Sequence, residues 1–257
     1  MNLFLVKKAF FDMWDNLLAV FIINIGFVAI LGGALYLPTL LGFNVAIQLV
    51  GVAIGISGFF LYTGAVSVAV RNMVDYQPTG FREFFSYFGQ TWKQSLVMSG
   101  FMIVQVFVLT IALPFYLSTG RVVGVGAASV IFWASVIWLL TSQSYFPALM
   151  RLDTSPRKVI RKIFMLFFDN TPFFIVLGIG SLAILAMSLF TALMLPGFTA
   201  ILIWHHAGLK LRLLKYDYLE ENPDENRKQI PWDALLIDER DRVGVRTFRG
   251  MIFPWKE

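Results

Sequence analysis

The chain has 257 residues and a net charge of +5; 58% of its residues are hydrophobic and only 14% are charged, against about 45–50% and about 25% in soluble domains. This composition excludes an ordinary soluble protein and predicts one membrane domain with a short soluble tail, and the absence of cysteine excludes disulfides and thiolate metal sites. The basic residues stand beside apolar segments, where membrane topology requires them, so we expect no nucleic acid as a partner.

Six long apolar segments predict an all-α protein with six transmembrane helices. A helix needs about 20 residues to cross the hydrocarbon core, and the first five segments reach that length without an ionised side chain. The sixth has a shorter apolar part, because Lys210, Arg212 and Lys215 fall within its last turns. If this segment crosses the membrane, these side chains have to extend to the interface. The predicted spans are Asn16–Leu37, Val45–Val70, Leu96–Leu117, Val122–Phe146, Phe173–Leu195 and Phe198–Tyr216.

The basic residues are distributed unevenly around these segments. Of the 21 Lys and Arg residues, only Arg121 falls in a predicted outer turn; the turns around Pro38 and Pro196 contain none. In membrane proteins the excess of Lys and Arg lies in the cytoplasmic loops. We therefore predict that both termini are cytoplasmic, with a six-span domain over residues 1–216 and a docked cytoplasmic tail over residues 217–257.

Three aromatic segments precede the first, third and fifth spans. Met1–Asn16 ends in Trp-Asp-Asn, Gly80–Gln94 in Trp-Lys-Gln and Ser155–Asn170 in Phe-Asp-Asn. Each is followed by an apolar stretch that reaches a Leu-Pro pair. We interpret them as amphipathic elbow helices in the interface plane, each opening one of three repeats made of elbow, span, outer turn and span. A loop packed on its own helix ends is the alternative for each elbow.

The first five spans contain no Asp, Glu, Lys, Arg or His. Ion-coupled carriers usually keep carboxylates or broken helices within the membrane, so we expect no coupled pump, while a passive pore stays open as an alternative. Asn24, Gln48 and Gln105 are expected to hydrogen-bond between helices, and Asp169 to cap the fifth span. We predict no catalytic residue, metal or cofactor, because the usual phosphate-binding, dinucleotide and nucleophile motifs do not occur.

His205 and His206 stand together in the sixth span. Adjacent helical residues point about 100° apart, so the pair is not expected to bind one metal ion. His206 and Lys210 are four residues apart and share a face. Together with Arg212 and Lys215 they form a candidate site for an anionic lipid headgroup, with anchoring of the helix end by positive charge as the alternative.

The tail differs in composition but is not featureless. Ile230–Ile237 reads as a short helix that begins at a proline, and Phe248–Trp255 mixes apolar, aromatic and basic residues. A disordered tail would contain few such residues. We predict that they dock on the elbows, on the bilayer interface or on a partner protein. The candidate docking residues are Trp232, Leu235, Leu236, Phe248, Ile252, Phe253 and Trp255.

Three short motifs resemble the YesL-like family of bacterial integral membrane proteins. They read FREFFSYFGQTWKQSL at residues 81–96, SQSYFPALMRL at residues 142–152 and YLPTLLG at residues 36–42. The resemblance covers residues 1–200 and leaves the tail unmatched. It implies a protein of the bacterial cytoplasmic (inner) membrane, often encoded near carbohydrate uptake systems, without an established activity.

The sequence thus predicts a non-enzymatic membrane protein that acts as an accessory or scaffold subunit of a membrane assembly, such as a carbohydrate or solute uptake system. Its expected partners are membrane lipids and, through the tail, another membrane protein. A passive transporter or channel for a small solute is the alternative. An enzyme acting on lipid headgroups is a third reading, which the absence of clustered carboxylates disfavours.

Overall fold

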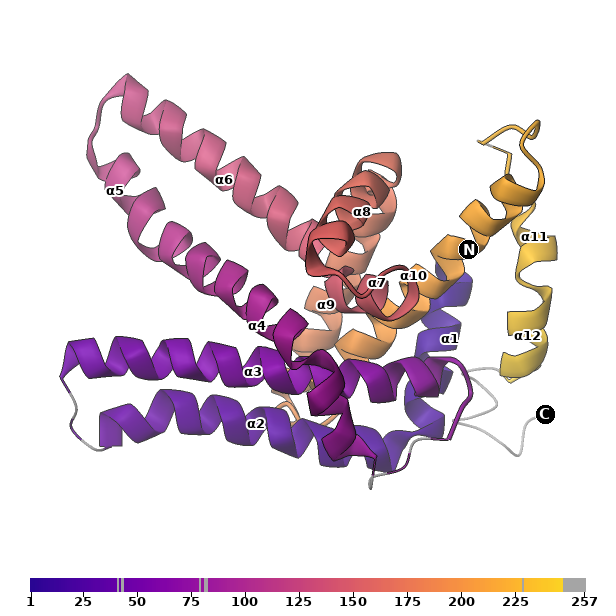
Figure 1. The fold of residues 1–257 in the computed structure, drawn as a ribbon, viewed down its shortest axis with the longest axis horizontal. Coiled ribbons are helices and arrows are strands. Elements are labelled where there is room, and N and C mark those ends of the chain that lie inside the picture. The colour runs from indigo at the N-terminus through magenta and orange to yellow at the C-terminus, as the bar shows by residue number, and fades with distance from the viewer. Residues whose placement is uncertain (41, 43, 79, 81–82, 228, 247–257) are drawn as a thin grey trace.

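The computed structural model describes residues 1–40, 42, 44–78, 80, 83–227 and 229–246, and this part of the chain contains helices and no strand (Figure 1). One short segment, η1, is a π-helix inside a longer helical stretch. In chain order the elements are α1 (Asn2–Asp15), α2 (Leu17–Leu40), α3 (Val45–Val74), α4 (Phe84–Phe107), η1 (Val108–Ala112), α5 (Leu113–Ser118), α6 (Val122–Ser142), α7 (Tyr145–Arg151), α8 (Pro156–Asp169), α9 (Thr171–Leu189), α10 (Gly197–Glu221), α11 (Trp232–Leu235) and α12 (Ile237–Val243).

Five stretches of the described chain are long and apolar enough to cross a membrane. They overlap the first five predicted spans, because helix length and hydropathy are properties that a sequence displays directly, although the third begins earlier, at Phe84, and the fifth ends earlier, at Leu189. The stretches are Leu17–Ala34, Ile47–Val74, Phe84–Ser118, Val122–Ser142 and Thr171–Leu189.

The sixth predicted span is a helix but is not among these five. α10 runs from Gly197 to Glu221, and its apolar part ends at Leu209, where Lys210 begins a run of basic residues. The helix continues without a break past Tyr216, so the tail starts inside a helix rather than at the predicted boundary.

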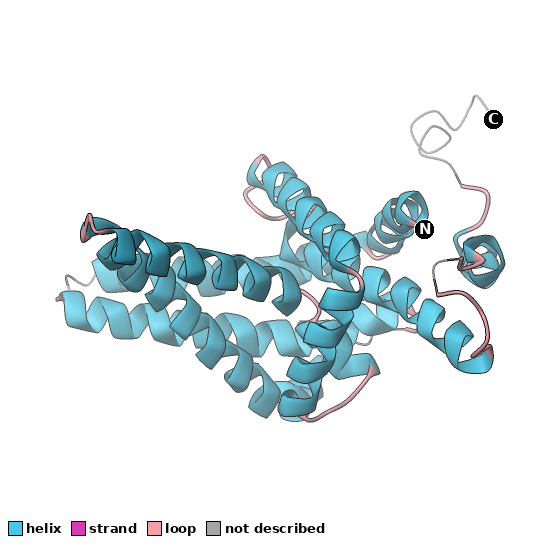
Figure 2. Cartoon of the chain, turned by 90° about the horizontal axis from the view of Figure 1, so that it is seen from above, coloured by secondary structure: helices cyan, strands magenta, loops and turns pink. Residues whose placement is uncertain are grey.

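The long hairpins project from one end of the molecule. Figures 1 and 2 show the α2–α3 hairpin and the hairpin of α4, α5 and α6 extending to the same side, while α1 and the α11–α12 pair lie at the opposite end. In Figure 1 the two hairpins diverge towards their tips. Many large apolar side chains near these tips are exposed, including Ile54, Phe115 and Val122. Such surfaces suit contact with lipid tails.

The buried core lies where the hairpins come together. One cluster joins α1, α2, α3, α9 and α10, with Leu5, Phe27 and Phe174 among its fully or almost fully buried members. A second cluster joins α4, α7, α8 and α10 around Tyr145 and Ile163, both fully buried. The base of the molecule is therefore the packed part, and it fixes the directions of the hairpins.

The predicted elbows are separate helices in the first and third cases only. α1 and α8 each end in an Asp-Asn pair, and the backbones of Asn16 (φ −115°) and Asn170 (φ −139°) leave the helical conformation. By contrast, Phe84–Phe107 is a single helix that runs through Gln94. Glutamine is a better helix former than asparagine, which is consistent with the continuous helix. The prediction of a separate second elbow is wrong, and the three predicted units are not equivalent.

Asn24 of α2 holds the turn between α9 and α10. Its Nδ2 donates to the carbonyls of Met194 and Pro196, both at 2.9 Å. Its Oδ1 accepts from the backbone N–H of Thr199 at 3.0 Å and from the Thr199 hydroxyl at 2.7 Å. Gly197, with φ +69°, packs so closely that a Cβ there would overlap the Asn24 amide. The hydrogen bonding between helices predicted for Asn24 is confirmed.

Candidate functional site

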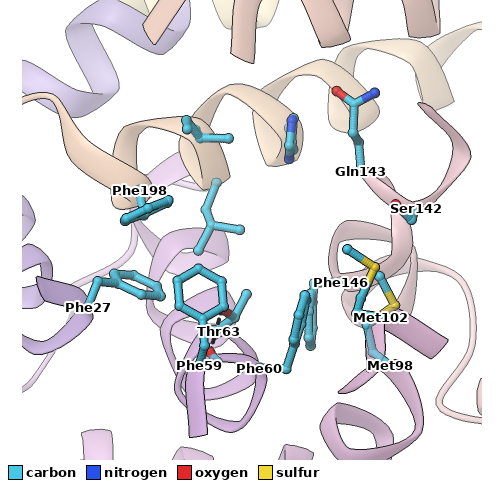
Figure 3. A pocket seen from close by; sticks show the side chains of 13 residues that line it. Phe27, Phe59, Phe60, Thr63, Met98, Met102, Ser142, Gln143, Phe146 and Phe198 are labelled. Atoms are coloured by element: carbon cyan, nitrogen blue, oxygen red, sulfur yellow. Dashed lines mark hydrogen bonds between the residues drawn. The ribbon is translucent and has the colours of Figure 1, made fainter. Parts of the chain in front are cut away.

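A cavity of about 170 Å³ lies where α2, α3, α4, α6, α7 and α10 meet. Figure 3 shows aromatic rings on one side of it and methionine side chains with further rings on the other. Its walls are therefore mainly apolar. The lining residues are Phe27, Phe59, Phe60, Thr63, Met98, Met102, Ser142, Gln143, Phe146, Phe198, Ile201, Leu202 and His205.

One wall of the cavity carries a short polar chain. The Ser181 hydroxyl lies 2.7 Å from His205 Nε2 and 3.4 Å from Gln143 Oε1, and it also donates to the Leu177 carbonyl at 2.8 Å. Among the lining residues there is no Asp, Glu, Lys or Arg. Acid–base or nucleophilic catalysis needs a base held by an orienting partner. Among the lining residues His205 is the one titratable side chain, and its Nε2 is already bonded to Ser181.

A second polar site is buried at the end of the molecule that carries α1 and α12. The Lys8 side chain is fully buried, and its Nζ lies 3.1 Å from the Asp12 carboxylate and 3.0 Å from the Glu239 carboxylate. The same Nζ donates to the Val74 carbonyl at 3.1 Å and to the Tyr76 hydroxyl at 2.8 Å. Sequence reasoning missed this site; its one local signal is the spacing of four between Lys8 and Asp12.

The network continues into α10 and α7. Lys210 lies 2.7 Å from Glu239 and 3.0 Å from Asp75, and Asp75 also pairs with Arg151 at 2.9 Å. Three cations and three carboxylates thus meet, contributed by α1, the end of α3, α7, α10 and α12. We call this set the ionic cluster: Lys8, Asp12, Asp75, Arg151, Lys210 and Glu239.

The protonation of the cluster follows from burial and from opposite charge. Burial alone would raise the pKa of the Glu239 carboxyl, but its hydrogen bond to Lys210 and the charge of Lys8 outweigh that effect and hold the pKa below its ordinary value. Burial raises the pKa of Asp12 to about 7 although Lys8 opposes the rise. Glu239 is therefore the carboxylate that stays charged between the two lysines.

The candidate headgroup site predicted on α10 does not form one open surface. His206 is fully buried, and neither of its ring nitrogens has a hydrogen-bond partner in the described chain. Lys210 is held within the ionic cluster. An anionic headgroup needs accessible cations, and these two side chains do not supply them.

The other two residues of that predicted site bind the end of α8. Arg212 Nε donates to Asn170 Oδ1 at 2.6 Å, and Lys215 lies 3.0 Å from the Asp169 carboxylate. Asp169 also accepts from the Tyr216 hydroxyl. α9 begins without a side-chain cap bond, so the capping role predicted for Asp169 is wrong. Arg212 and Lys215 thus hold the end of the elbow α8 against α10.

The described part of the tail packs on the protein. Leu236 is fully buried in the larger core cluster, and the partly buried Trp232 packs against it. The Trp232 ring also lies 5.6 Å from the Arg212 guanidinium, and Leu235 is half-buried. The other predicted docking residues lie outside the described residues: Phe248, Ile252, Phe253 and Trp255.

These features define a class of protein. The chain has a multi-pass helical membrane architecture, with five candidate membrane-crossing helices in its described part and a polar network at the base of the bundle. Comparison of the chain with protein-family models, with curated proteins and with solved structures finds no match.

Proposed function

We propose that the protein is a non-enzymatic accessory or scaffold subunit of a membrane assembly. It crosses the bacterial cytoplasmic membrane six times and keeps both termini in the cytoplasm. The resemblance to the YesL-like family suggests that the assembly takes up a carbohydrate or another solute. The tail is the part that binds the partner subunit.

Charge and shape support this orientation. If α10 did not cross the membrane, the ten Lys and Arg residues from Lys210 onward would lie outside the cell, contrary to the usual excess of positive charge inside. Figures 1 and 2 also put α1 and the α11–α12 pair together, opposite the tips of the long hairpins. An even number of crossings is consistent with both termini on one side.

The observation that carries the proposal is the way in which the tail is held. Glu239 of α12 bridges Lys8 and Lys210 in the ionic cluster. Beyond α12, Arg246 pairs with Asp15 at the end of α1 at 2.7 Å. A surface that is already fixed loses less conformational entropy on binding than a mobile tail does. This favours a tail that presents a surface to another protein.

The outward side of α12 has the composition of such a surface. Ile237 is 53% exposed, and the exposed Asp241 lies one turn further along the same side of the helix, while the exposed Asp238 points about 100° away. An apolar residue surrounded by charged ones is typical of an interface with a small apolar centre and a polar rim.

A passive transporter or channel is the second candidate function, and the cavity is the observation that favours it. A hydrated solute needs a polar path, however, and here the hydroxyls of Thr63 and Ser142 donate to backbone carbonyls of their own helix. The remaining lining is mostly aromatic and aliphatic. The apolar walls therefore favour the scaffold function over solute passage.

The first prediction concerns topology. A green fluorescent protein fused after Glu257, or inserted within residues 77–80, is expected to fluoresce, because both positions lie in the cytoplasm in the proposed orientation. Alkaline phosphatase inserted beside Arg121 is expected to be active, because that turn lies outside. Activity of a phosphatase fused after Glu257 would contradict six crossings.

The second prediction tests the scaffold function. A photo-cross-linking amino acid at Ile237 is expected to form one major adduct with another membrane protein in native membranes. Reversing charge with Asp238→Lys/Asp241→Lys is expected to reduce that adduct at least about tenfold. Two lysines would face the partner's basic groups, and like charges across an interface cost more binding free energy than the about 1.4 kcal/mol that corresponds to tenfold. Quantitative immunoblotting of the adduct measures the effect.

The matched control reverses two exposed carboxylates away from α12. Asp224→Lys/Glu225→Lys makes the same change in net charge in the loop before α11 and is expected to leave the adduct unchanged. Equal loss with both double variants would contradict a specific surface on α12. Solute flux into proteoliposomes of the purified chain, without an adduct in cells, would support the transporter instead.

A further inference from the structure

One side of the elbow helix α8 is fixed to the protein. Val159, Ile163 and Phe167 are at most 4% exposed and recur every four residues. Val159 and Ile163 belong to the second core cluster and Phe167 to the first. Their positions determine which side of α8 faces away from the bundle.

The outward side of α8 changes from basic to apolar along its length. Arg157, Lys158 and Arg161 are exposed in the first half of the helix. Met165 and Phe168 follow on the same side and are 62% and 68% exposed. The spacing of these residues, at three or four positions, lines them up along one face.

The cations of this face differ from those of α10, which form ion pairs with carboxylates of the protein. Arg157 and Arg161 form no hydrogen bond or ion pair with any described residue, and Lys158 approaches Asp153 only at 4.0 Å while its side chain stays 71% exposed. Arg157 and Arg161 are therefore free to bind an anion outside the protein, and the exposed Lys158, only weakly paired, stands beside them.

The apolar half of the face immediately precedes a candidate membrane span in the chain. Phe168 is three residues before Thr171, where the apolar candidate span α9 begins. Trp14 and Trp92, the aromatic residues at the matching positions of the other aromatic segments, are also exposed, at 45% and 46%. Exposed aromatic side chains next to a span are typical of the membrane–water interface.

We infer that the outward face of α8 binds anionic phospholipids. Met165 and Phe168 enter the boundary of the acyl region, and Arg157, Lys158 and Arg161 bind the phosphate groups of the adjacent headgroups. An amphipathic helix with basic and large apolar residues binds in this way, through apolar burial together with attraction to anionic lipid. This site is independent of the scaffold function and needs no protein partner.

The site is tested with the full chain purified in mild detergent. The protein is titrated with phosphatidylglycerol and, separately, with phosphatidylcholine of the same acyl chains, and bound lipid is counted by native mass spectrometry. Phosphatidylglycerol is expected to bind more tightly. Arg157→Gln/Arg161→Gln is expected to weaken its binding about 25-fold, from about fivefold for each basic residue, and to leave phosphatidylcholine unaffected.

Two controls separate this site from diffuse charge and from loss of folding. Arg121→Gln/Arg227→Gln removes the same charge at exposed positions elsewhere and is expected to leave phosphatidylglycerol binding unchanged. The α8 variant is expected to melt at the wild-type temperature, because the buried side of the helix is untouched. Equal weakening by both double variants, or equal affinity of the wild type for the two lipids, would overturn the inference.

A further variant and a competition experiment distinguish a lipid from other anions. Phe168→Ser is expected to weaken the binding of both lipids, and excess inorganic phosphate is expected not to displace phosphatidylglycerol. Displacement by phosphate together with no effect of Phe168→Ser would identify a soluble-phosphate site and reject the lipid. An α8 variant that keeps phosphatidylglycerol but loses a cross-linked protein would reject it in favour of a protein interface.

Discussion

Replacing Lys8 by methionine is expected to destabilise the protein by about 3–5 kcal/mol, the usual cost of removing one partner from a buried ion pair. Methionine matches the length of the lysine stem, so the lost interactions are mainly electrostatic. Without the ammonium group, the carboxylates of Asp12 and Glu239 face each other in a buried site. Thermal unfolding in mild detergent, followed by tryptophan fluorescence, measures the change.

The same substitution is expected to loosen the tail. Glu239 keeps its bond to Lys210 but loses its contact with Lys8, so α12 is held by fewer interactions. Trypsin is therefore expected to cut at Arg240 and Arg242 faster than in the wild type, because a docked backbone is protected. Cleavage sites and rates are read by mass spectrometry.

Lys7→Met is the matched control for Lys8→Met. Lys7 is only half-buried, and its Nζ donates one hydrogen bond, to the Gly244 carbonyl at 3.0 Å. Its replacement is expected to cost about 1 kcal/mol, the usual net value of a single hydrogen bond. If the two variants melted alike and were cut alike, the ionic cluster would not be what holds the tail.

Replacing Asn24 by leucine is expected to destabilise the protein by about 2 kcal/mol, because four hydrogen bonds across helices are lost at about 0.6 kcal/mol each. The substitution leaves the Thr199 N–H and the carbonyls of Met194 and Pro196 without the side chain that satisfies them. The turn between α9 and α10 is then expected to open. The melting temperature in mild detergent, together with exchange of the Thr199 amide hydrogen, reports both effects.

Gln105→Leu is the matched control for Asn24→Leu. Gln105 is also a buried amide within a span, but its Nε2 has no hydrogen-bond partner in the described chain. Removing an unsatisfied buried donor is neutral or stabilising. We therefore expect no loss of stability. A loss equal to that of Asn24→Leu would mean that any buried amide stabilises this bundle, whatever its bonds.

The elbows show how far a local pattern can be read. The Asp-Asn pairs that end α1 and α8 are visible in the sequence, and both helices end there. The matching segment of α4 has the same aromatic character but carries Gln94 in place of the asparagine, and the helix continues. Aromatic residues alone therefore indicate the interface and do not show whether the helix ends there, while Asp-Asn at both breaks and Pro172 at the start of α9 are the local features that α4 lacks.

The predicted headgroup site shows where local reasoning fails. His206 and Lys210 do share a helix face, as their spacing requires, yet that face is buried against α3, α7 and α12. A sequence shows which side chains point the same way on one helix. It does not show what packs against them, because the packing partners come from distant segments.

By itself the sequence determined that the chain is helical and which five stretches are able to cross a membrane, since helix length and hydropathy are local quantities. It also indicated that the tail contains residues able to dock. Only the tertiary structure decided that Lys8 meets Glu239, from opposite ends of the chain, and that Asn24 holds the turn before α10. Such pairs form because the packed bundle excludes water, so that a buried polar group is stabilised only by a partner within the protein.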